Sequence, residues 1–426
     1  MKYYSHTLGC KVNAYETAAI DRELDEHGFS RAETLESADI VLLNTCSVTG
    51  KADAKSRQHI SSFRKRNPNA VLVVMGCYGQ ADSAKCASIG ADIVLGTSSR
   101  SKVIPYLERF LLERKTIVDV KPSVRKERYE ELGANAFCEN ARAYLKVQDG
   151  CDNFCSYCYI PMLRGNSRSR EPREVVEEAV SLVEKGYQEI VLTGVDTGSY
   201  GKDLGDGSFT FTDLMEAILK NCPSLFRLRI SSIEESQIDD RFLSFLESHP
   251  QVADHLHIPL QSGSPGVLKR MKRHYNCGAF LEKLARIRSV RPEIAITTDV
   301  IVGYPEETDE EFTETLEFCK KASFAEIHVF PFSPRPGTYA ATRPDLPSAI
   351  KKERVHALLA LSKSLRSEYK QRFFGREMEV LFEEYDAQKK RCSGHTSNYL
   401  LVNVESEEDL HGQRRIVQYD SKIASD

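Results

Sequence analysis

The sequence predicts an α/β protein in three parts: an open parallel α/β domain, then a partial (β/α)6 barrel, and finally a small all-β barrel. Three observations lead to this prediction. The first hundred residues alternate short apolar runs with amphipathic ones, six more strand-like runs follow from about residue 143, and the last fifty residues carry strand-like runs broken by glycines. Repeated strand and helix units with continuous apolar strands are typical of parallel sheets that helices cover on both faces.

The N-terminal domain is expected at residues 1–112. Its predicted strands are Lys2–Gly9, Ala38–Thr45, Ala70–Cys77 and Ala91–Thr97. Asn13 followed by Glu16 predicts the N-cap of the first helix, and Gly28 predicts its end. Residues 113–136 are charged and show no strand pattern, so we expect a linker there.

The barrel is expected at residues 137–367. Its predicted strands are Ala143–Gln148, Gln188–Val195, Phe226–Ile233, His255–Gln261, Ala295–Val302 and Glu326–Phe332. Barrels of this kind place their chemistry on the loops at the carboxyl ends of the strands. A long amphipathic helix, Ser348–Phe374, leads to the C-terminal module at residues 370–426, with predicted strands Met378–Tyr385, Tyr399–Val404 and Arg414–Tyr419.

The composition excludes several classes of protein. The 426 residues carry 58 Lys and Arg against 62 Asp and Glu, so no overall positive charge indicates a nucleic-acid partner. No apolar run reaches the roughly 18 residues of a membrane span, and the opening MKYYSHTLGC lacks the layout of a signal peptide. We expect a cytoplasmic protein without a membrane partner. In that reducing compartment, clustered cysteines among the 12 present favour metal ligands or catalysts.

Three cysteines follow predicted strands of the N-terminal domain. Cys10, Cys46 and Cys77 are separated by 36 and 31 residues, which is one strand-helix-strand unit each. Because the carboxyl ends of parallel strands share one edge of a sheet, the three thiols are expected to converge. The alternative is that each is a small buried apolar residue. We interpret the remaining cysteines as structural: Cys86, Cys138, Cys222, Cys277, Cys319 and Cys392.

The sharpest motif is a C-x3-C-x2-C triplet directly after the first barrel strand. Cys151, Cys155 and Cys158 place three soft thiolates on one loop, which suits an iron-sulfur cluster. With no fourth cysteine nearby, one iron keeps an open position that can bind a small molecule. Zinc is the alternative, although structural zinc sites usually close four ligands.

The triplet, with Tyr157 before the third cysteine, resembles the signature of radical S-adenosylmethionine enzymes. The whole chain resembles the methylthiotransferases among them, because GCKVNAYET, NTCSVTGKADAKSRQ, VMGCYGQ and QDGCDNFCSYCYIPMLRGNSRSR occur in family order. The resemblance implies that Cys10, Cys46 and Cys77 hold a second, auxiliary 4Fe-4S cluster. It also implies a radical S-adenosylmethionine core, a TRAM-like β-barrel at the C-terminus and S-adenosylmethionine as cofactor.

Polar residues in the loops after the barrel strands are candidates for binding this cofactor. In the resemblance these loops hold the part of S-adenosylmethionine that the open iron does not chelate. Ordinary helix capping and turn chemistry is the alternative. The candidates are Tyr157, Thr193, Gly194, Ser232, Glu234 and Gln261.

Positive charge is concentrated in three groups that together predict a path for a polyanion. Residues 51–66 form the first, Arg164, Arg168, Arg170 and Arg173 the second, and Lys269, Arg270, Lys272 and Arg273 the third. Each group could instead be a solvated face. Arg164 and Arg168 are the candidates for binding a substrate carboxylate, with phosphate contact as the alternative.

The resemblance implies an enzyme that converts an aromatic C–H bond to C–S–CH3. The first two motifs look like the branch that acts on N6-threonylcarbamoyladenosine at position 37 of tRNA. N6-isopentenyladenosine in tRNA and an aspartate of a ribosomal protein are the alternative substrates. A non-catalytic iron-sulfur protein that binds RNA is the alternative of a different class. The implied partners are the tRNA anticodon stem-loop, an electron donor protein and a sulfur donor.

Overall fold

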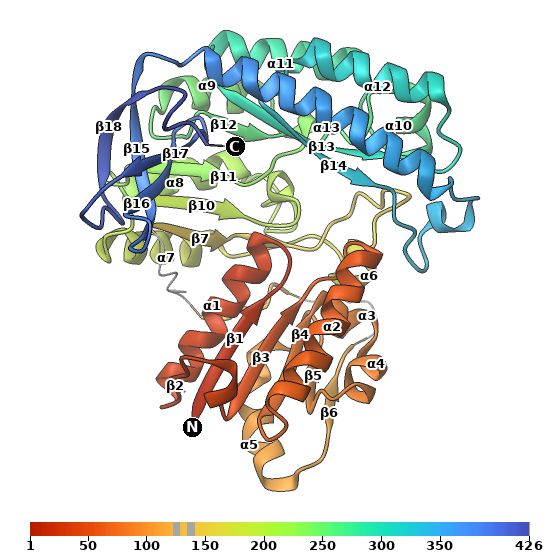
Figure 1. The fold of residues 1–426 in the computed structure, drawn as a ribbon, viewed down its shortest axis with the longest axis vertical. Coiled ribbons are helices and arrows are strands. Elements are labelled where there is room, and N and C mark those ends of the chain that lie inside the picture. Colours follow the sequence, from red (N-terminus) through yellow and green to blue (C-terminus); the bar gives the residue numbers. More distant parts are fainter. Residues whose placement is uncertain (122–127, 134–140, 426) are drawn as a thin grey trace.

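The computed structural model describes residues 1–121, 128–133 and 141–425. Its N-terminal domain lies below the barrel in Figure 1, and the C-terminal module lies at one end of the barrel. Cys138 and the expected start of the barrel domain at residue 137 lie outside the described residues. No described helix is both long and apolar enough to cross a membrane.

The N-terminal domain contains a six-stranded sheet in which all pairs are parallel, as predicted. The strand order is β2 (Ser30–Arg31), β1 (Lys2–Thr7), β3 (Ile40–Thr45), β4 (Val71–Gly76), β5 (Ile93–Leu95) and β6 (Ile117–Asp119). One face packs on α1 (Lys11–Glu26) and α5 (Val103–Glu113). The other packs on α2 (Gly50–Arg66), α3 (Cys77–Ala81) and α4 (Ser83–Ser88). The residues of β3 and β4 are all buried, which explains their continuous apolar sequences.

Two local predictions for this domain were wrong. Helix α1 begins after Cys10 and not after Asn13, the predicted N-cap. The Asn13 side chain does not cap the helix but donates to the Leu8 and Thr45 carbonyls at 2.8 and 3.0 Å. The expected linker contains a strand, since Ile117–Asp119 adds to the sheet as β6. Three residues are too few for their alternation to stand out within a charged segment. Gly28 follows the end of α1 with φ 80°, as predicted.

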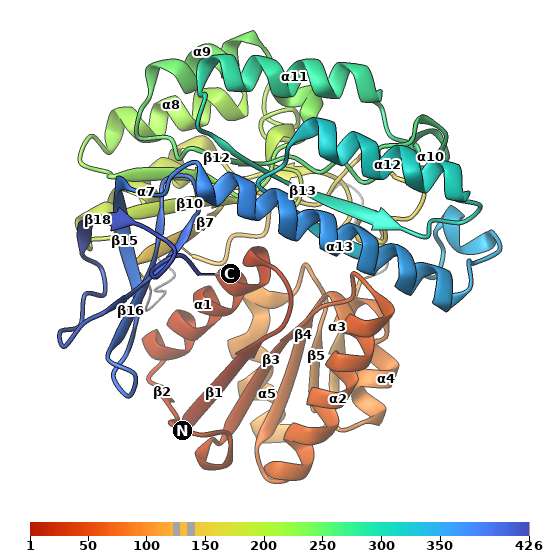
Figure 2. The same cartoon turned by 45° about the horizontal axis from the view of Figure 1, so that its top comes forward.

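The six predicted barrel strands are all present and parallel. They are β7 (Arg142–Lys146), β10 (Glu189–Thr193), β11 (Arg227–Ile230), β12 (His255–His257), β13 (Ala295–Val302) and β14 (Glu326–Pro331). Two three-stranded sheets, β7-β10-β11 and β12-β13-β14, are joined by a bridge between Leu228 and Val252. Figure 2 shows helices covering their outer side. These helices are α7 (Pro172–Glu184), α8 (Phe211–Asn221), α9 (Asp240–Ser248), α10 (Pro265–Met271), α11 (Cys277–Val290), α12 (Asp309–Ala322) and α13 (Ser348–Gln371).

The outer and inner faces of the barrel strands differ in chemistry. The outer residues of β7, β10 and β11 belong to the apolar core with the helices. The alternate residues are mostly polar or charged: Arg142, Lys146, Glu189, Arg227, Arg229, His255, His257, Thr297, Asp299 and His328. We call this polar inner face the lumen.

The N-terminal domain covers the open side of the barrel. Helix α1 contacts β7, one edge of the described barrel sheet. At the other edge, the Gly50 amide at the start of α2 donates to Ser333 Oγ at 3.0 Å, just beyond β14. The carboxyl ends of the N-terminal strands therefore face the lumen, as Figure 1 shows.

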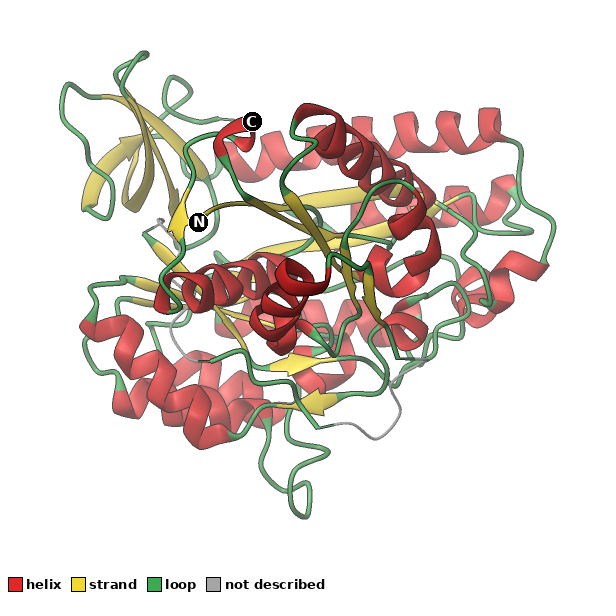
Figure 3. Cartoon of the chain, turned by 90° about the horizontal axis from the view of Figure 1, so that it is seen from below, coloured by secondary structure: helices red, strands yellow, loops and turns green. Residues whose placement is uncertain are grey.

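The C-terminal module is an antiparallel sheet, visible as a group of strands at one corner of Figure 3. Its order is β17 (Leu401–Glu405), β16 (Arg391–Thr396), β15 (Arg376–Asp386) and β18 (Arg414–Tyr419). The sequence reasoning missed β16, because RCSGHT is polar and contains a glycine. The loop after β16 closes the end of the barrel where the strands begin, since Arg229 donates to the Ser397 carbonyl at 3.1 Å.

Short elements complete the described structure. A two-stranded antiparallel ribbon, β8 (Gln148–Asp149) and β9 (Arg168–Ser169), brackets the loop of the C-x3-C-x2-C motif, which contains α6 (Ile160–Leu163). Single 3-10 turns occur at Leu35–Ser37, Arg100–Lys102, Thr197–Ser199, Glu235–Gln237 and Tyr339–Thr342.

Candidate active site

The three cysteines of the N-terminal domain lie at one edge of its sheet. Cys10 follows β1, Cys46 follows β3 directly, and Cys77 follows β4 directly. Gly9 brings the first two loops together: it has φ 105°, and a Cβ there would lie 2.9 Å from Cys46 Cβ. A larger residue would push Cys10 and Cys46 apart.

These three thiols influence one another electrostatically. Cys10 is exposed, Cys46 is half-buried and Cys77 is buried. Burial, and then the neighbouring thiols, raises the pKa of Cys77 to about 11, although Arg164 acts in the opposite direction. The Cys77 thiol is therefore protonated at neutral pH until a metal binds it, and metal binding would release its proton.

The second set of cysteines lies in the loop between β8 and β9. Gly150 starts this loop with φ 72°, and a Cβ there would lie 1.9 Å from the Asn166 carbonyl oxygen, so only glycine fits. Burial raises the pKa of Cys158 to about 12. Arg273 Nη1 donates to Cys155 Sγ at 3.5 Å.

The sequence reasoning missed Arg273 and Asp196 as members of this site. Asp196, in the loop after β10, lies 3.8 Å from Cys151 Sγ and accepts from Asn153 Nδ2 at 3.1 Å. Arg273 also forms an ion pair with Glu234. The position of Asp196 in the sequence TGVDTG, directly after a barrel strand, was a signal that could have identified it as a site residue. No local sequence signal distinguished Arg273 from the basic residues beside it.

A cavity of about 220 Å³ lies beside the Cys158 thiol. Tyr157 and Gln261, both predicted to bind the cofactor, line it, and so do Val48 and Thr49 from the loop after Cys46. Gln261 has a left-handed backbone (φ 65°), held by bonds to the main chain of Asp299 and Ile301 at 2.8 and 2.9 Å. The cavity thus lies between the two cysteine sets.

The other predicted cofactor residues do not line this cavity. Thr193 is buried, and its carbonyl accepts from the Val147 amide at 2.9 Å. A Cβ on Gly194 would lie 3.0 Å from Gln148 Oε1. The Ser232 carbonyl accepts from Thr197, and Glu234 pairs with Arg273. A role for these four residues in cofactor binding stays a prediction.

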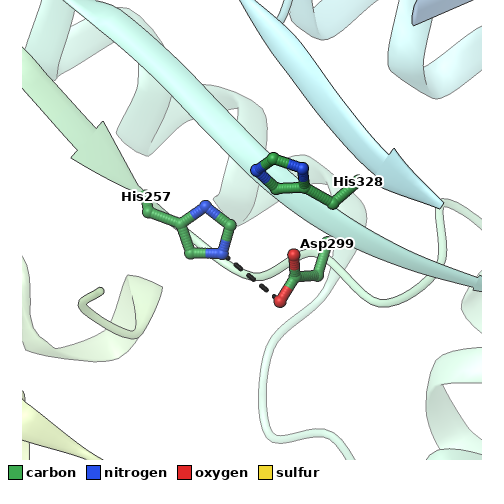
Figure 4. Close-up of side chains that lie close together, drawn as sticks. All are labelled: His257, Asp299 and His328. Atoms are coloured by element: carbon green, nitrogen blue, oxygen red, sulfur yellow. Dashed lines mark ion pairs between the residues drawn. The ribbon is translucent and has the colours of Figure 1, made fainter. Parts of the chain in front are cut away.

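The cysteines fit iron-sulfur clusters better than single metal ions. Among the described residues, only His257, Asp299 and His328 bring three potential ligand atoms within 4.8 Å of one another (Figure 4). A zinc site requires all of its ligand atoms close around one ion, and the sulfur atoms of neither cysteine set lie that close together. In an iron-sulfur cluster each thiolate binds a different iron, so the sulfur atoms can lie farther apart. Arg164 and Arg273 beside the thiols suit the negative charge of a thiolate-bound cluster.

The structure argues against substrate binding by Arg164 and Arg168. Arg164 is buried, and its Nη1 donates to Glu16 and Asp149, each at 2.9 Å. Arg168 is also buried, 3.7 Å from Asp149. Both lie where the N-terminal domain packs on the barrel, a burial that their position beside the cysteine loop does not reveal.

The same packing changes the interpretation of the three basic groups. In the second group Arg170 is buried with Glu178, and in the third Arg270 pairs with Glu311 at 2.6 Å. The first group keeps an exposed basic face on α2 and still supports polyanion binding, and Lys269 and Lys272 of the third group are also exposed. The exposed members of the first group are Lys51, Lys55, Lys65 and Arg66.

Comparisons with known proteins agree with this architecture. Residues 2–96 match a family model described as "Uncharacterized protein family UPF0004", and residues 145–319 match the radical SAM superfamily. The fold is similar to that of the radical S-adenosylmethionine methyltransferase TsrM from Kitasatospora setae, solved with cobalamin and a 4Fe-4S cluster. The TM-score is 0.58 at 14% identity, covering 80% of this chain and 77% of that chain.

Closer relatives cover nearly the whole chain. The threonylcarbamoyladenosine tRNA methylthiotransferase MtaB of Bacillus subtilis is 44% identical, covering 96% of this chain and 91% of the relative. The MtaB of Thermotoga maritima is 37% identical, covering 92% and 89%. The tRNA-2-methylthio-N(6)-dimethylallyladenosine synthase of Bacillus velezensis is 32% identical, covering 97% and 82%.

The fold and the cysteine loop define a radical S-adenosylmethionine enzyme. With relatives this similar over nearly its whole length, the chain belongs to the family of radical S-adenosylmethionine methylthiotransferases.

Proposed function

We propose that the protein converts N6-threonylcarbamoyladenosine at position 37 of tRNA to its 2-methylthio derivative. The relatives that carry this activity in their names reach 44% identity, against 32% for the dimethylallyladenosine synthase of Bacillus velezensis. The structural observation that carries the proposal is the cavity between two separate cysteine sets. One set lies on the barrel and the other on the N-terminal domain.

In this proposal Cys151, Cys155 and Cys158 hold the cluster that binds S-adenosylmethionine. Cys10, Cys46 and Cys77 hold the auxiliary cluster that is associated with sulfur insertion. When bound, S-adenosylmethionine and its cluster supply the one-electron chemistry that breaks an unactivated C–H bond, which side-chain acids and bases cannot do.

Hydrogen bonds between the two domains fix the positions of the two cysteine sites relative to each other. Arg335, in the loop after β14, donates to Ser47 Oγ at 3.0 Å and to Asp53 at 2.6 Å. These bonds tie the loop after Cys46 to the barrel beside the cavity. Phe330 and Phe332 also line the cavity. Tyr157 and Gln261 line the cavity, which supports their proposed contact with the bound cofactor.

The reaction also requires partners. We propose that the anticodon stem-loop of tRNA lies against the exposed basic face of α2. Cleavage of S-adenosylmethionine needs an electron, and each turnover uses a sulfur atom. We therefore propose an electron donor protein and a sulfur donor as the other two partners. We propose the cytoplasm as the location, since tRNA is the substrate.

Mass spectrometry of tRNA nucleosides tests the substrate. Deleting the gene should remove the 2-methylthio derivative and leave N6-threonylcarbamoyladenosine. Loss of the methylthio group from isopentenyladenosine, or from a ribosomal-protein aspartate, would replace the proposal with the corresponding alternative.

A second experiment tests catalysis and the separate roles of the two sites. Purified protein with S-adenosylmethionine and a reductant should form 5'-deoxyadenosine, whereas a non-catalytic RNA-binding protein would form none. Changing both Cys10 and Cys46 to Ala should keep this cleavage and abolish methylthiolation. Cys86→Ala is the matched control, because Cys86 is a buried cysteine of the same domain outside the site.

A further inference from the structure

Three neighbouring strands of the barrel bring two histidines and an aspartate together on the lumen. His257 ends β12, Asp299 lies in β13 and His328 lies in β14. In the register of the sheet, Asp299 is the direct partner of His328, and His257 is the partner of Thr297, two residues before Asp299. Since side chains two residues apart on a strand share a face, His257, Asp299 and His328 all project from the same side of the sheet.

Potential ligand atoms of the three side chains lie within 4.8 Å of one another. His257 Nε2 lies 3.3 Å from Asp299 Oδ2, the contact marked in Figure 4. Ligand atoms bound about 2.1 Å from one ion lie roughly 3 to 4 Å apart. His257 and Asp299 already meet this requirement. His328 is exposed, so a rotation of its side chain can close the remaining distance without repacking the core.

Thr297 orients the ring of His257. Thr297 is buried, and its Oγ1 lies 3.0 Å from His257 Nδ1 and 3.0 Å from His255 Nε2. A hydroxyl group can accept one hydrogen bond and donate another, so this one can accept from His257 Nδ1–H and donate to His255. His257 then presents an unprotonated Nε2 toward Asp299. Histidines that bind metal ions usually donate their other ring N–H in a hydrogen bond that fixes the ring.

The three residues border the cavity beside Cys158. Asp299 is one of the residues that line this cavity, and Phe330, two residues after His328, is another. The Gln261 amide donates to the Asp299 carbonyl at 2.8 Å, which joins β13 to another part of the cavity wall. An ion held here would have three protein ligands, and its remaining coordination positions would be open to water or to an oxygen atom of a molecule in the cavity.

We propose that His257, Asp299 and His328 bind one divalent transition-metal ion, at a site separate from both cysteine sets. Two imidazole nitrogens and one carboxylate oxygen suit Fe²⁺, Co²⁺, Ni²⁺ or Zn²⁺, whereas Mg²⁺ and Ca²⁺ prefer oxygen ligands throughout. The site contains no thiolate, so its occupancy can be measured separately from that of the clusters. The inference does not depend on which base the enzyme modifies.

The test titrates Mn²⁺ into the cluster-loaded protein under anaerobic conditions and follows the ion by electron paramagnetic resonance. Mn²⁺ prefers nitrogen and oxygen ligands to thiolates, so the cysteines do not obscure the result. One Mn²⁺ should bind per chain, and pulsed spectra should show couplings to two imidazole nitrogen atoms. Ni²⁺ should displace the bound Mn²⁺, because it binds such ligands more tightly, whereas excess Mg²⁺ should not.

Substitutions identify the ligands. His257→Gln, Asp299→Asn and His328→Gln should each weaken Mn²⁺ binding at least about 10-fold, since even residues that only orient metal ligands contribute that much. His356→Gln is the matched control, because His356 is an exposed histidine of α13 outside the lumen, and it should keep the wild-type affinity. An iron content equal to that of the wild type shows that a variant has kept its fold and its clusters.

Three results would overturn the proposal. A wild-type protein that binds no Mn²⁺ at millimolar concentration has no such site. Bound Mn²⁺ that shows no nitrogen couplings, or that Mg²⁺ displaces, lies at an oxygen site elsewhere. An iron-loaded variant that keeps the wild-type affinity removes its residue from the site and overturns the three-residue assignment. If a variant loses its iron, the nitrogen couplings of the wild-type protein decide the question, because they need no substitution.

Discussion

The Glu16 carboxylate accepts a hydrogen bond from Arg164 Nη1 at 2.9 Å, and both side chains are buried. Glu16 belongs to α1 of the N-terminal domain and Arg164 to the cysteine loop of the barrel, so this pair joins the two cysteine sites. Lys146 Nζ also binds Glu16, at 2.8 Å. Burial opposes the ionisation of Glu16, yet Arg100, Arg164 and Lys146 together hold its pKa well below the usual value.

Glu16→Gln should destabilise the packing of the two domains strongly. Removing one charge of a buried network leaves its cations unpaired, which costs about 3–5 kcal/mol in free energy of unfolding. Chemical denaturation of the loaded protein measures this. Glu36→Gln is the control, because Glu36 pairs with Arg66 at the exposed surface, where a salt bridge contributes little to stability. Equal effects of the two substitutions would mean that the buried network does not hold the interface.

Changing Cys151, Cys155 and Cys158 to Ala should leave about half of the iron, because each cysteine set belongs to its own domain. Iron and sulfide analysis of anaerobically prepared protein measures the content. Cys222→Ala, in the apolar core of the barrel, should keep all of it. Undiminished iron in the triple variant would refute the assignment of this triplet to a cluster.

Replacing Lys51 and Lys55 with Gln should weaken tRNA binding and reduce its salt dependence. These exposed lysines lie one turn apart on α2, and losing two phosphate contacts lowers the slope of log K against log salt by about 2. Binding titrations at several salt concentrations give the slope. Cleavage of S-adenosylmethionine should be unaffected. Lys115→Gln, beyond α5 at the far end of the domain, should leave the slope unchanged, and a drop there as large as that of the pair would exclude a specific face on α2.

Removing residues 375–426 should abolish cofactor cleavage together with RNA binding. The C-terminal module supplies the Thr396 and Ser397 carbonyls to Arg229, so its loss leaves this guanidinium without half of its partners. Changing Lys389 and Lys390 to Gln, in an exposed turn of the same module, should leave 5'-deoxyadenosine formation intact. A truncated protein that still cleaves S-adenosylmethionine at the wild-type rate would show that the barrel does not need this closure.

The sequence alone was sufficient to predict the positions of the strands whose ends carry the site residues. All six barrel strands and the four predicted strands of the N-terminal domain were found at the right places. In the N-terminal domain, continuous apolar runs indicate burial on both faces of the sheet, and in the barrel, apolar residues on the outer face indicate packing against the helices. The cysteines could be assigned to their strand ends for the same reason. The spacing of Cys151, Cys155 and Cys158 is a local property that does not depend on distant segments.

The tertiary structure decided which charges are free. Arg164, Arg168 and Arg273 lie in sequences as basic as those of Lys51 and Lys55, yet the first three are covered by other segments and paired, whereas the two lysines are exposed. Whether a charge is solvated or paired depends on the segments that pack around it, and these can lie far away in the chain, as Glu16 and Arg164 do at 148 residues apart. Local periodicity carries no information about that packing.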